Sequence, residues 1–66
     1  MFIVIEVQKN NDSPAAVLTF VLDTYEEAMQ KYYLICSAAV VSTINAHSVF
    51  VMTTDGSIYQ QQTFNH

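Results

Sequence analysis

The hydrophobic and polar positions of the chain follow a period of about two residues, then a period of about 3.6, then a period of two again. Four segments rich in β-branched and aromatic residues have the composition and alternation of β-strands. The pattern predicts strands over residues 2–8, 15–22, 47–54 and 57–64, and a helix from residue 25 to residue 40 or 41. The order β-β-α-β-β predicts one α+β domain, residues 1–66, with one helix on one face of a four-stranded, largely antiparallel sheet.

Local signals mark the ends of these elements. Thr24-x-x-Glu27 fits a helix capping box, in which the hydroxyl accepts a hydrogen bond from a helix amide and the glutamate reaches back to the cap backbone. Glu27 and Lys31 are spaced to form an ion pair along the helix. No glycine ends the helix, and Asn45 is the nearest residue that tolerates a left-handed conformation. Asp55-Gly56 predicts a two-residue hairpin loop between the last two strands.

The predicted helix has apolar side chains on two sides. At about 100° per residue one stripe suits the sheet, and a second stripe has the spacing of a further contact surface. The first stripe comprises Ala28, Tyr32, Ile35, Cys36 and Ala39. The second, called the helix stripe below, comprises Leu34, Ser37, Ala38 and Val41.

The predicted strands carry apolar residues at both odd-numbered and even-numbered positions, and so on both faces of the sheet. The neighbours Ile3 and Val4, and Val49 and Phe50, are examples. One helix covers only one face of a sheet, so a single copy would expose a large apolar patch, which soluble monomers rarely do. We therefore expect a homo-oligomer with the helix stripe as its interface. The alternatives are a monomer with an apolar surface and a chain that docks on a different partner.

Composition and charge exclude several classes of function. Hydrophobic residues make up 52% of the 66 residues and charged residues only 12%, against roughly 25% charged in an ordinary soluble domain. The net charge of −4 and the two lysines argue against nucleic acid and against an anionic membrane surface as partners. One cysteine allows no internal disulfide. Because no signal peptide or membrane span is evident, the expected location is the cytoplasm.

Candidate chemistry is sparse. The histidines and the cysteine lack metal-ligand spacing, the sole glycine forms no phosphate loop, and no acid–base pair or cofactor motif is present. His47 either contacts a ligand or is a strand-end histidine bonded to the backbone. Cys36 is predicted to be a core thiol. Aromatic and neutral polar residues near the helix end suit a ligand pocket, and the predicted binding residues are Tyr32, Tyr33, Asn45, His47 and Ser48.

Several short segments give the chain a resemblance to a known group of proteins. They are the strand Ile5-Glu6-Val7-Gln8, the helix from Glu27-Ala28 to Lys31-Tyr32, Ser37-Ala38-Ala39, Ala46-His47-Ser48, and Asp55-Gly56. In these the chain resembles very short phage and prophage proteins of Gram-positive (Firmicutes) bacteria. The resemblance covers most of the chain, implies a location in the infected host cell, and carries no catalytic residue with it.

Size, expected assembly and this resemblance suggest a non-enzymatic, oligomeric binding protein. Phages encode tiny oligomeric proteins that sequester nucleotide-like immune signals, and an anti-defence protein of that kind is our first hypothesis. The second is an interaction protein that inhibits a host enzyme by surface contact, or a minor phage structural component. The third is a hydrolase or nuclease that uses His47, for which the sequence offers the histidine no evident partner.

Overall fold

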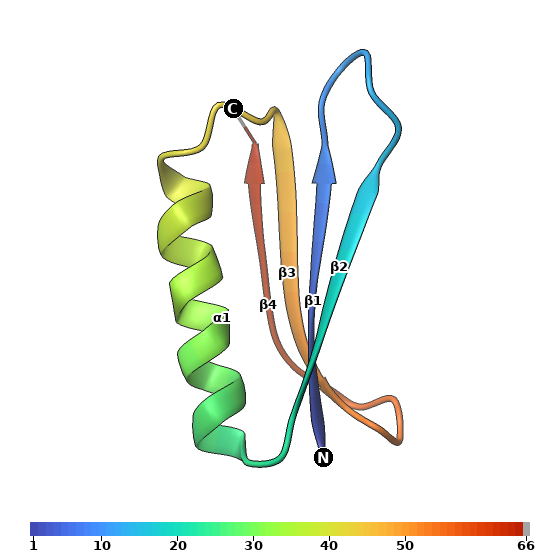
Figure 1. The fold of residues 1–66 in the computed structure, drawn as a ribbon, viewed down its shortest axis with the longest axis vertical. Coiled ribbons are helices and arrows are strands. Elements are labelled where there is room, and N and C mark those ends of the chain that lie inside the picture. The colour runs from blue at the N-terminus through green and yellow to red at the C-terminus, as the bar shows by residue number, and fades with distance from the viewer. Residues whose placement is uncertain (66) are drawn as a thin grey trace.

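The computed structural model describes residues 1–65 and contains one helix and one sheet (Figure 1). The elements are β1 (Phe2–Lys9), β2 (Ala16–Leu22), α1 (Tyr25–Val40), β3 (Ala46–Thr53) and β4 (Ile58–Asn65). They confirm the predicted β-β-α-β-β order to within one residue at each end. No helix within residues 1–65 has the length and apolar character that crossing a bilayer requires.

The four strands form an antiparallel sheet in the order β2-β1-β3-β4. Since β2 and β3 are both antiparallel to β1, they run in the same direction, and the chain must return to the other end of the sheet between them. Helix α1 makes this return. Its 16 residues span about 24 Å at 1.5 Å per residue, which is close to the length of an eight-residue strand.

The core lies between α1 and the two central strands. Val4, Val49 and Val51 are fully buried beneath the helix. The helix residues that are buried are Ala28, Met29, Tyr32, Ile35 and Ala39. The predicted sheet-facing stripe is therefore confirmed, with Cys36 half-buried beside it and Met29 an additional member.

The two ends of α1 differ in how they are capped. At the start, the Thr24 hydroxyl accepts a hydrogen bond from Glu27 N–H at 3.2 Å, as predicted. The Glu27 carboxylate accepts a bond from that same hydroxyl at 2.9 Å, instead of the expected backbone amide. At the other end, Val41 N–H donates to the carbonyl of Ala39. Among residues 1–65 only Gly56 has a positive φ, so Asn45 does not adopt the left-handed conformation.

Two further expectations were wrong in detail. The β3–β4 loop has three residues, because Thr53 N–H bonds to Ser57 O and Gly56 N–H bonds to Thr53 O. Gly56 takes the left-handed position with φ of 96°, as in a type I turn closed by a bulge. Lys31 forms no ion pair with Glu27 within the described part of the chain; its amino group lies over the Phe20 ring, 4.1 Å from the centroid.

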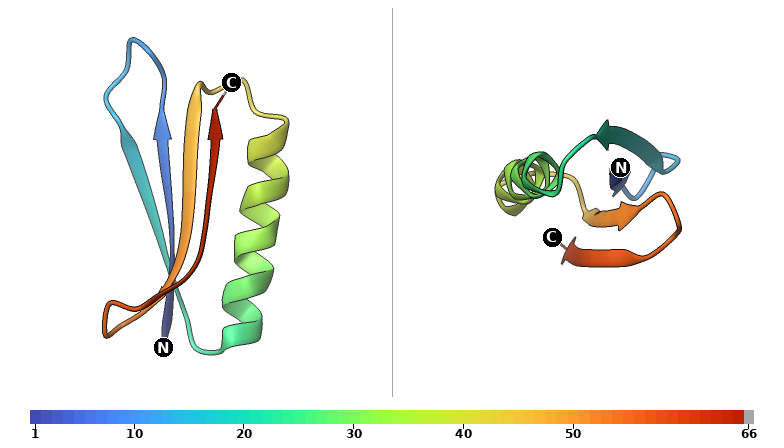
Figure 2. Two further views of the ribbon diagram at one scale, coloured as in Figure 1. Left: turned by 180° about the vertical axis from the view of Figure 1, so that it is seen from behind. Right: turned by 90° about the horizontal axis from the view of Figure 1, so that it is seen from below.

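The face of the sheet opposite α1 has no covering layer within residues 1–65 (Figure 2). Successive side chains of a strand point to opposite faces of the sheet. The observed register then shows which side chains of the four strands share this outer face. Its apolar members are Ile3, Ile5, Val7, Val17, Val21, Phe50, Met52 and Ile58. The expectation that both faces of the sheet are apolar is confirmed; the assembly inferred from it stays a prediction.

Candidate functional site

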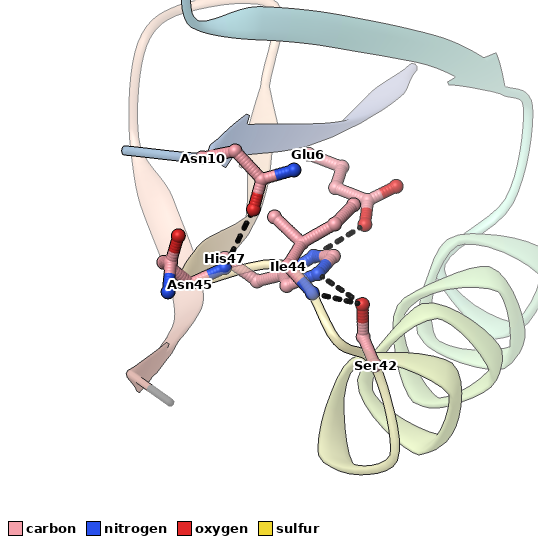
Figure 3. A network of polar contacts seen from close by, with 6 residues as sticks. All are labelled: Glu6, Asn10, Ser42, Ile44, Asn45 and His47. Carbon is pink, nitrogen blue, oxygen red and sulfur yellow. Dashed lines mark hydrogen bonds and ion pairs between the residues drawn. The ribbon is translucent and has the colours of Figure 1, made fainter. Parts of the chain in front are cut away.

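Three polar side chains meet under the C-terminal end of α1 (Figure 3). His47 Nδ1 lies 3.0 Å from Glu6 Oε2, and His47 Nε2 lies 2.9 Å from Ser42 Oγ. Because a carboxylate can only accept, Nδ1 carries the proton donated to Glu6. In the neutral imidazole, Nε2 then accepts the Ser42 hydroxyl proton. The three side chains form a continuous hydrogen-bonded network, which we call the Glu6–His47–Ser42 network.

The strand register brings Glu6 and His47 together. Gln8 of β1 pairs with His47 of β3, and Glu6 lies two residues before Gln8, on the same face. Both side chains therefore point beneath α1, in line with the buried Val4 and Val49. His47 is 3% exposed and Glu6 8% exposed. Each supplies the partner that a polar group needs when it is buried.

The α1–β3 connection positions Ser42. The Ile44 N–H donates to Ser42 Oγ at 3.1 Å, a local turn that fixes the hydroxyl. Asn45 then anchors the connection to the β1–β2 loop: its N–H donates to Asn10 Oδ1, and its own Oδ1 accepts from Asn11 N–H, both at 3.0 Å. Residues distant in the sequence thus hold Ser42 beside His47, as Figure 3 shows for Asn10 and Asn45.

A pocket of about 390 Å³ opens beside the network, between α1 and the inner face of β1 and β2. Its polar lining is Glu6, Gln8, Lys31, Ser42 and His47, and its apolar lining is Phe20, Leu34, Ile35, Ala38 and Ile44. A second hollow of about 340 Å³ shares Lys31 and Leu34 with it, so the two lie next to each other along the helix. An apolar wall with a few fixed polar groups is the usual make-up of a small-molecule site.

Polar capacity remains in the pocket after the network has formed. Glu6 Oε2 is engaged by His47, while Oε1 has no protein partner among residues 1–65, and the side chain is 11% exposed. Among residues 1–65, Lys31 is the only lysine or arginine that lines the pocket, and its amino group lies over the Phe20 ring. The pocket therefore offers an acceptor at its base and a positive charge at its rim.

The five predicted binding residues do not converge on one place. His47 faces the pocket, whereas Ser48 is on the outer face and lies 3.5 Å from the Thr63 hydroxyl. Tyr32 is a core residue, and Tyr33 is 60% exposed with its ring 5.4 Å from that of Tyr32. Asn45 fixes the connection as described above. Of the set, only His47 lines the pocket.

The helix stripe has a different relation to the site. Leu34, Ser37, Ala38 and Val41 are all exposed, as expected for a surface stripe. Leu34 and Ala38 also form part of the pocket wall. A partner seated on this stripe would therefore cover the mouth of the pocket.

The remaining reactive groups lie apart from this chemistry. Burial raises the pKa of the Cys36 thiol, and the nearby Glu6 charge adds to the rise, although a hydrogen bond with Tyr32 opposes it. Burial also raises the pKa of Tyr32. Both side chains are protonated at neutral pH and suit a core. Within residues 1–65 no three His, Cys, Asp or Glu side chains are grouped to hold a metal ion.

Sequence reasoning missed Glu6, and it left Ser42 out of the five predicted binding residues. It expected His47 to bond to the backbone if it bound no ligand. A signal for Glu6 was present: it follows Phe2 and Val4 at the inward parity of β1, where a charge needs a buried partner. Comparisons of the chain with protein-family models, with curated proteins and with solved structures give no match. The functional argument therefore depends on the geometry of this site.

Proposed function

We propose that the protein is a non-enzymatic binding protein that holds a small molecule in the pocket between α1 and β2. The observation that carries this proposal is the opening of a buried, fixed polar network into a pocket whose remaining lining is mostly apolar. A preformed arrangement of this kind binds without first ordering its own side chains, which lowers the entropic penalty of association.

The lining defines the class of ligand. The apolar wall of Leu34, Ile35, Ala38 and Ile44 favours a flat or aliphatic body. Glu6 Oε1 favours an N–H or O–H donor, and Lys31 favours one anionic group. A nucleoside or nucleoside monophosphate combines these features. Glu6 in the pocket and Glu27 in the neighbouring hollow disfavour ligands rich in phosphate.

Sequestration is the mode of action in this proposal: the protein holds its ligand without changing it. By analogy with the tiny phage proteins that sequester nucleotide-like signals, the proposed natural ligand is a nucleotide-derived immune signal. The volume of about 390 Å³ lies at the lower end of the range of roughly 300–1,000 Å³ for small-molecule sites. It suits a single nucleoside unit better than a cyclic dinucleotide.

A thermal-shift screen with nucleosides, nucleoside monophosphates, cyclic mononucleotides and cyclic dinucleotides tests the proposal. At ten times Kd a ligand stabilises the fold by about 1.4 kcal/mol, which raises Tm by roughly 6–11 °C in a domain of this size. The test variant is Leu34→Lys, because Leu34 is 64% exposed and lines the pocket. Val40→Lys is the matched control, since Val40 is 57% exposed and outside the lining.

Binding that Leu34→Lys abolishes and Val40→Lys preserves would support the pocket. Absence of any shift across the four ligand classes would count against this ligand class. Equal loss of binding in both variants would place the ligand elsewhere on the helix.

One further observation supports a second candidate function. Ser42 Oγ lies 2.9 Å from His47 Nε2, and His47 Nδ1 lies 3.0 Å from Glu6 Oε2. A nucleophile, a base and an orienting carboxylate are arranged in this order in serine hydrolases. In an ester hydrolysis, Ser42 Oγ would attack the carbonyl carbon and His47 would take its proton and pass it to the leaving alcohol. Water would then cleave the acyl-serine to release the acid. The Ile44 N–H bond to Oγ, however, already gives the hydroxyl a structural role, so binding is the preferred proposal.

Mass spectrometry separates the two functions. Recovery of the intact small molecule after denaturing the complex supports sequestration. Release of alcohol from a small carboxylic ester that disappears in Ser42→Ala, while the variant remains folded, would support hydrolysis.

A further inference from the structure

We infer that the outer face of the sheet is the contact surface of a two-fold symmetric dimer, and that its occupant is a second copy of this chain. The inference is independent of the proposed ligand, because the pocket lies on the opposite face, beneath α1. It also replaces the helix stripe by the sheet as the surface of self-association.

The outer face is apolar over β1 and over parts of the other three strands, and its polar members include Thr19, Ser48, Gln61 and Thr63. One row runs from Thr19 through Ile5 and Phe50 to Gln61, one residue from each strand. Ile5 and Phe50, at the centre, are half-buried by their neighbours alone. At the two edges Val21 is 58% exposed and Ile58 is 56% exposed. Soluble proteins rarely leave a contiguous apolar surface of this extent in water.

The distribution of charge favours a second copy as the occupant. The chain has two lysines and six acidic residues, and a net charge of −4. The acidic residues and Lys31 lie on α1, in the loops or, for Glu6, on the inner face. Lys9, at the end of β1, has the outer parity, but its amino group bonds to the carbonyls of Asn10 and Ser13 in the adjoining loop. Two such faces can therefore meet without burying or opposing like charges.

The area of the face matches what a dimer needs. Four strands spaced about 4.8 Å apart, with seven or eight residues at about 3.3 Å each, give a flat footprint of roughly 19 by 25 Å. Two such footprints remove about 1,000 Å² from water, and the side chains that stand on them add to it. A specific interface requires a total of about 1,000 Å² or more. The helix stripe offers one narrow row of four residues.

The geometry of the resulting dimer follows from the way in which sheets pack. Two outer faces stack about 10 Å apart, with strand directions within about 30° of each other. The helices then lie on the two outer sides of a four-layer sandwich, and each pocket remains open. A two-fold axis through the face makes the contact self-complementary.

Light scattering coupled to size-exclusion chromatography tests the inference on the unmodified chain. The expected mass is twice 7.4 kDa at about 100 μM, a concentration well above a micromolar Kd. The test variant is Val21→Lys, because an exposed edge-strand lysine is tolerated in a monomer but would be buried without a partner in the dimer. We expect it to weaken dimerisation by about 30-fold or more. Val41→Lys is the control, at an 80% exposed position on the helix stripe.

Each outcome decides the inference. A single-chain mass for the unmodified protein at this concentration would overturn it, and would leave the face to a different partner. Loss of the dimer in Val41→Lys with retention in Val21→Lys would assign the interface to the helix stripe. A dimer that Val21→Lys alone disrupts supports the sheet face. Should Val21→Lys fail to fold, Val17→Lys replaces it, because Val17 lies on the same outer face of β2 and is 62% exposed. Loss of the dimer in Val17→Lys supports the sheet face, and a dimer as stable as that of the unmodified chain overturns it.

Discussion

Removing the carboxylate of the Glu6–His47–Ser42 network by Glu6→Ala should destabilise the protein by about 3 kcal/mol. The variant leaves His47 Nδ1 without its acceptor at a site where the histidine is only 3% exposed. A hydrogen bond to a charged group contributes about 1.5–3 kcal/mol, and an unsatisfied buried donor costs about 1–3 kcal/mol. The carboxylate is itself 11% exposed and so retains some hydration, which keeps the expected loss at the lower end of the roughly 3–5 kcal/mol of a fully buried pair.

This loss is large for so small a chain. At about 0.05–0.15 kcal/mol per residue, 66 residues have a total stability of roughly 3–10 kcal/mol. The Tm of Glu6→Ala should fall by about 12–24 °C, at about 4–8 °C per kcal/mol. Glu6→Gln keeps an oxygen acceptor for Nδ1–H and loses only the charge, so it should cost about 1 kcal/mol.

Urea unfolding followed by circular dichroism measures these differences, with all proteins at one concentration because assembly makes stability depend on it. Glu26→Ala is the control, since Glu26 is an exposed acidic residue at the start of α1 and its removal should change stability by about 0.5 kcal/mol or less. The double variant Glu6→Leu/His47→Leu should be more stable than the sum of the single changes Glu6→Leu and His47→Leu implies, by about 2 kcal/mol. Each single change leaves the other member of the buried pair without its partner, and the double change does not. A Glu6→Ala variant as stable as Glu26→Ala, or single changes that simply add, would refute the coupling of Glu6 to His47.

Three further changes test other parts of the fold. Thr24→Ala should lower the free energy of unfolding by about 1 kcal/mol, since the hydroxyl caps Glu27 N–H; Thr24→Ser, which keeps the hydroxyl, should not, and urea unfolding distinguishes them. The Thr53 hydroxyl and the Ser57 N–H lower the pKa of Asp55 below its ordinary 3.8. The stability that the ionised Asp55 contributes is therefore present above pH 3.8 and is lost as the pH falls through the lowered pKa. The difference in Tm between the wild type and Asp55→Ala should accordingly close on acidification. Burial raises the pKa of Cys36 above its ordinary 9.0. Iodoacetamide at pH 8 should therefore alkylate the folded protein more slowly than the protein unfolded in urea. Equal rates of alkylation would show that the thiol is accessible in the folded protein.

The elements of this fold were predictable because each has a local cause. The alternation in residues 2–8, the Thr24 cap and the Asp55-Gly56 turn are set by neighbours in the sequence, and the structure has each within one residue of its predicted place. The two apolar faces of the sheet were equally visible, because strand periodicity alone assigns residues to faces. The length of the last hairpin loop was missed, because a two-residue and a three-residue loop use the same Asp-Gly signal.

The site was not predictable in the same way, because it depends on strand order and register. Glu6 and His47 are 41 residues apart, and they meet only because β1 lies beside β3 with Gln8 opposite His47. Ser42 reaches Nε2 only because Asn45 is fixed to Asn10 and Asn11 of a different loop. His47 and Ser48 were grouped as neighbours in sequence, yet consecutive strand residues point to opposite faces.

The network is the strongest reason to look for function on the inner face. Val49 and Val51 continue from His47 along the same side of β3 and are fully buried. Aliphatic residues at positions 47 and 6, which are diagonal neighbours on this face, would therefore extend the core. Replacing a buried polar pair by apolar side chains of similar volume is often neutral or stabilising. Stability alone therefore does not account for three polar side chains at this place. A pocket that needs a fixed acceptor at its base does account for them, since Glu6 turns one oxygen to His47 and has a second without a protein partner among residues 1–65.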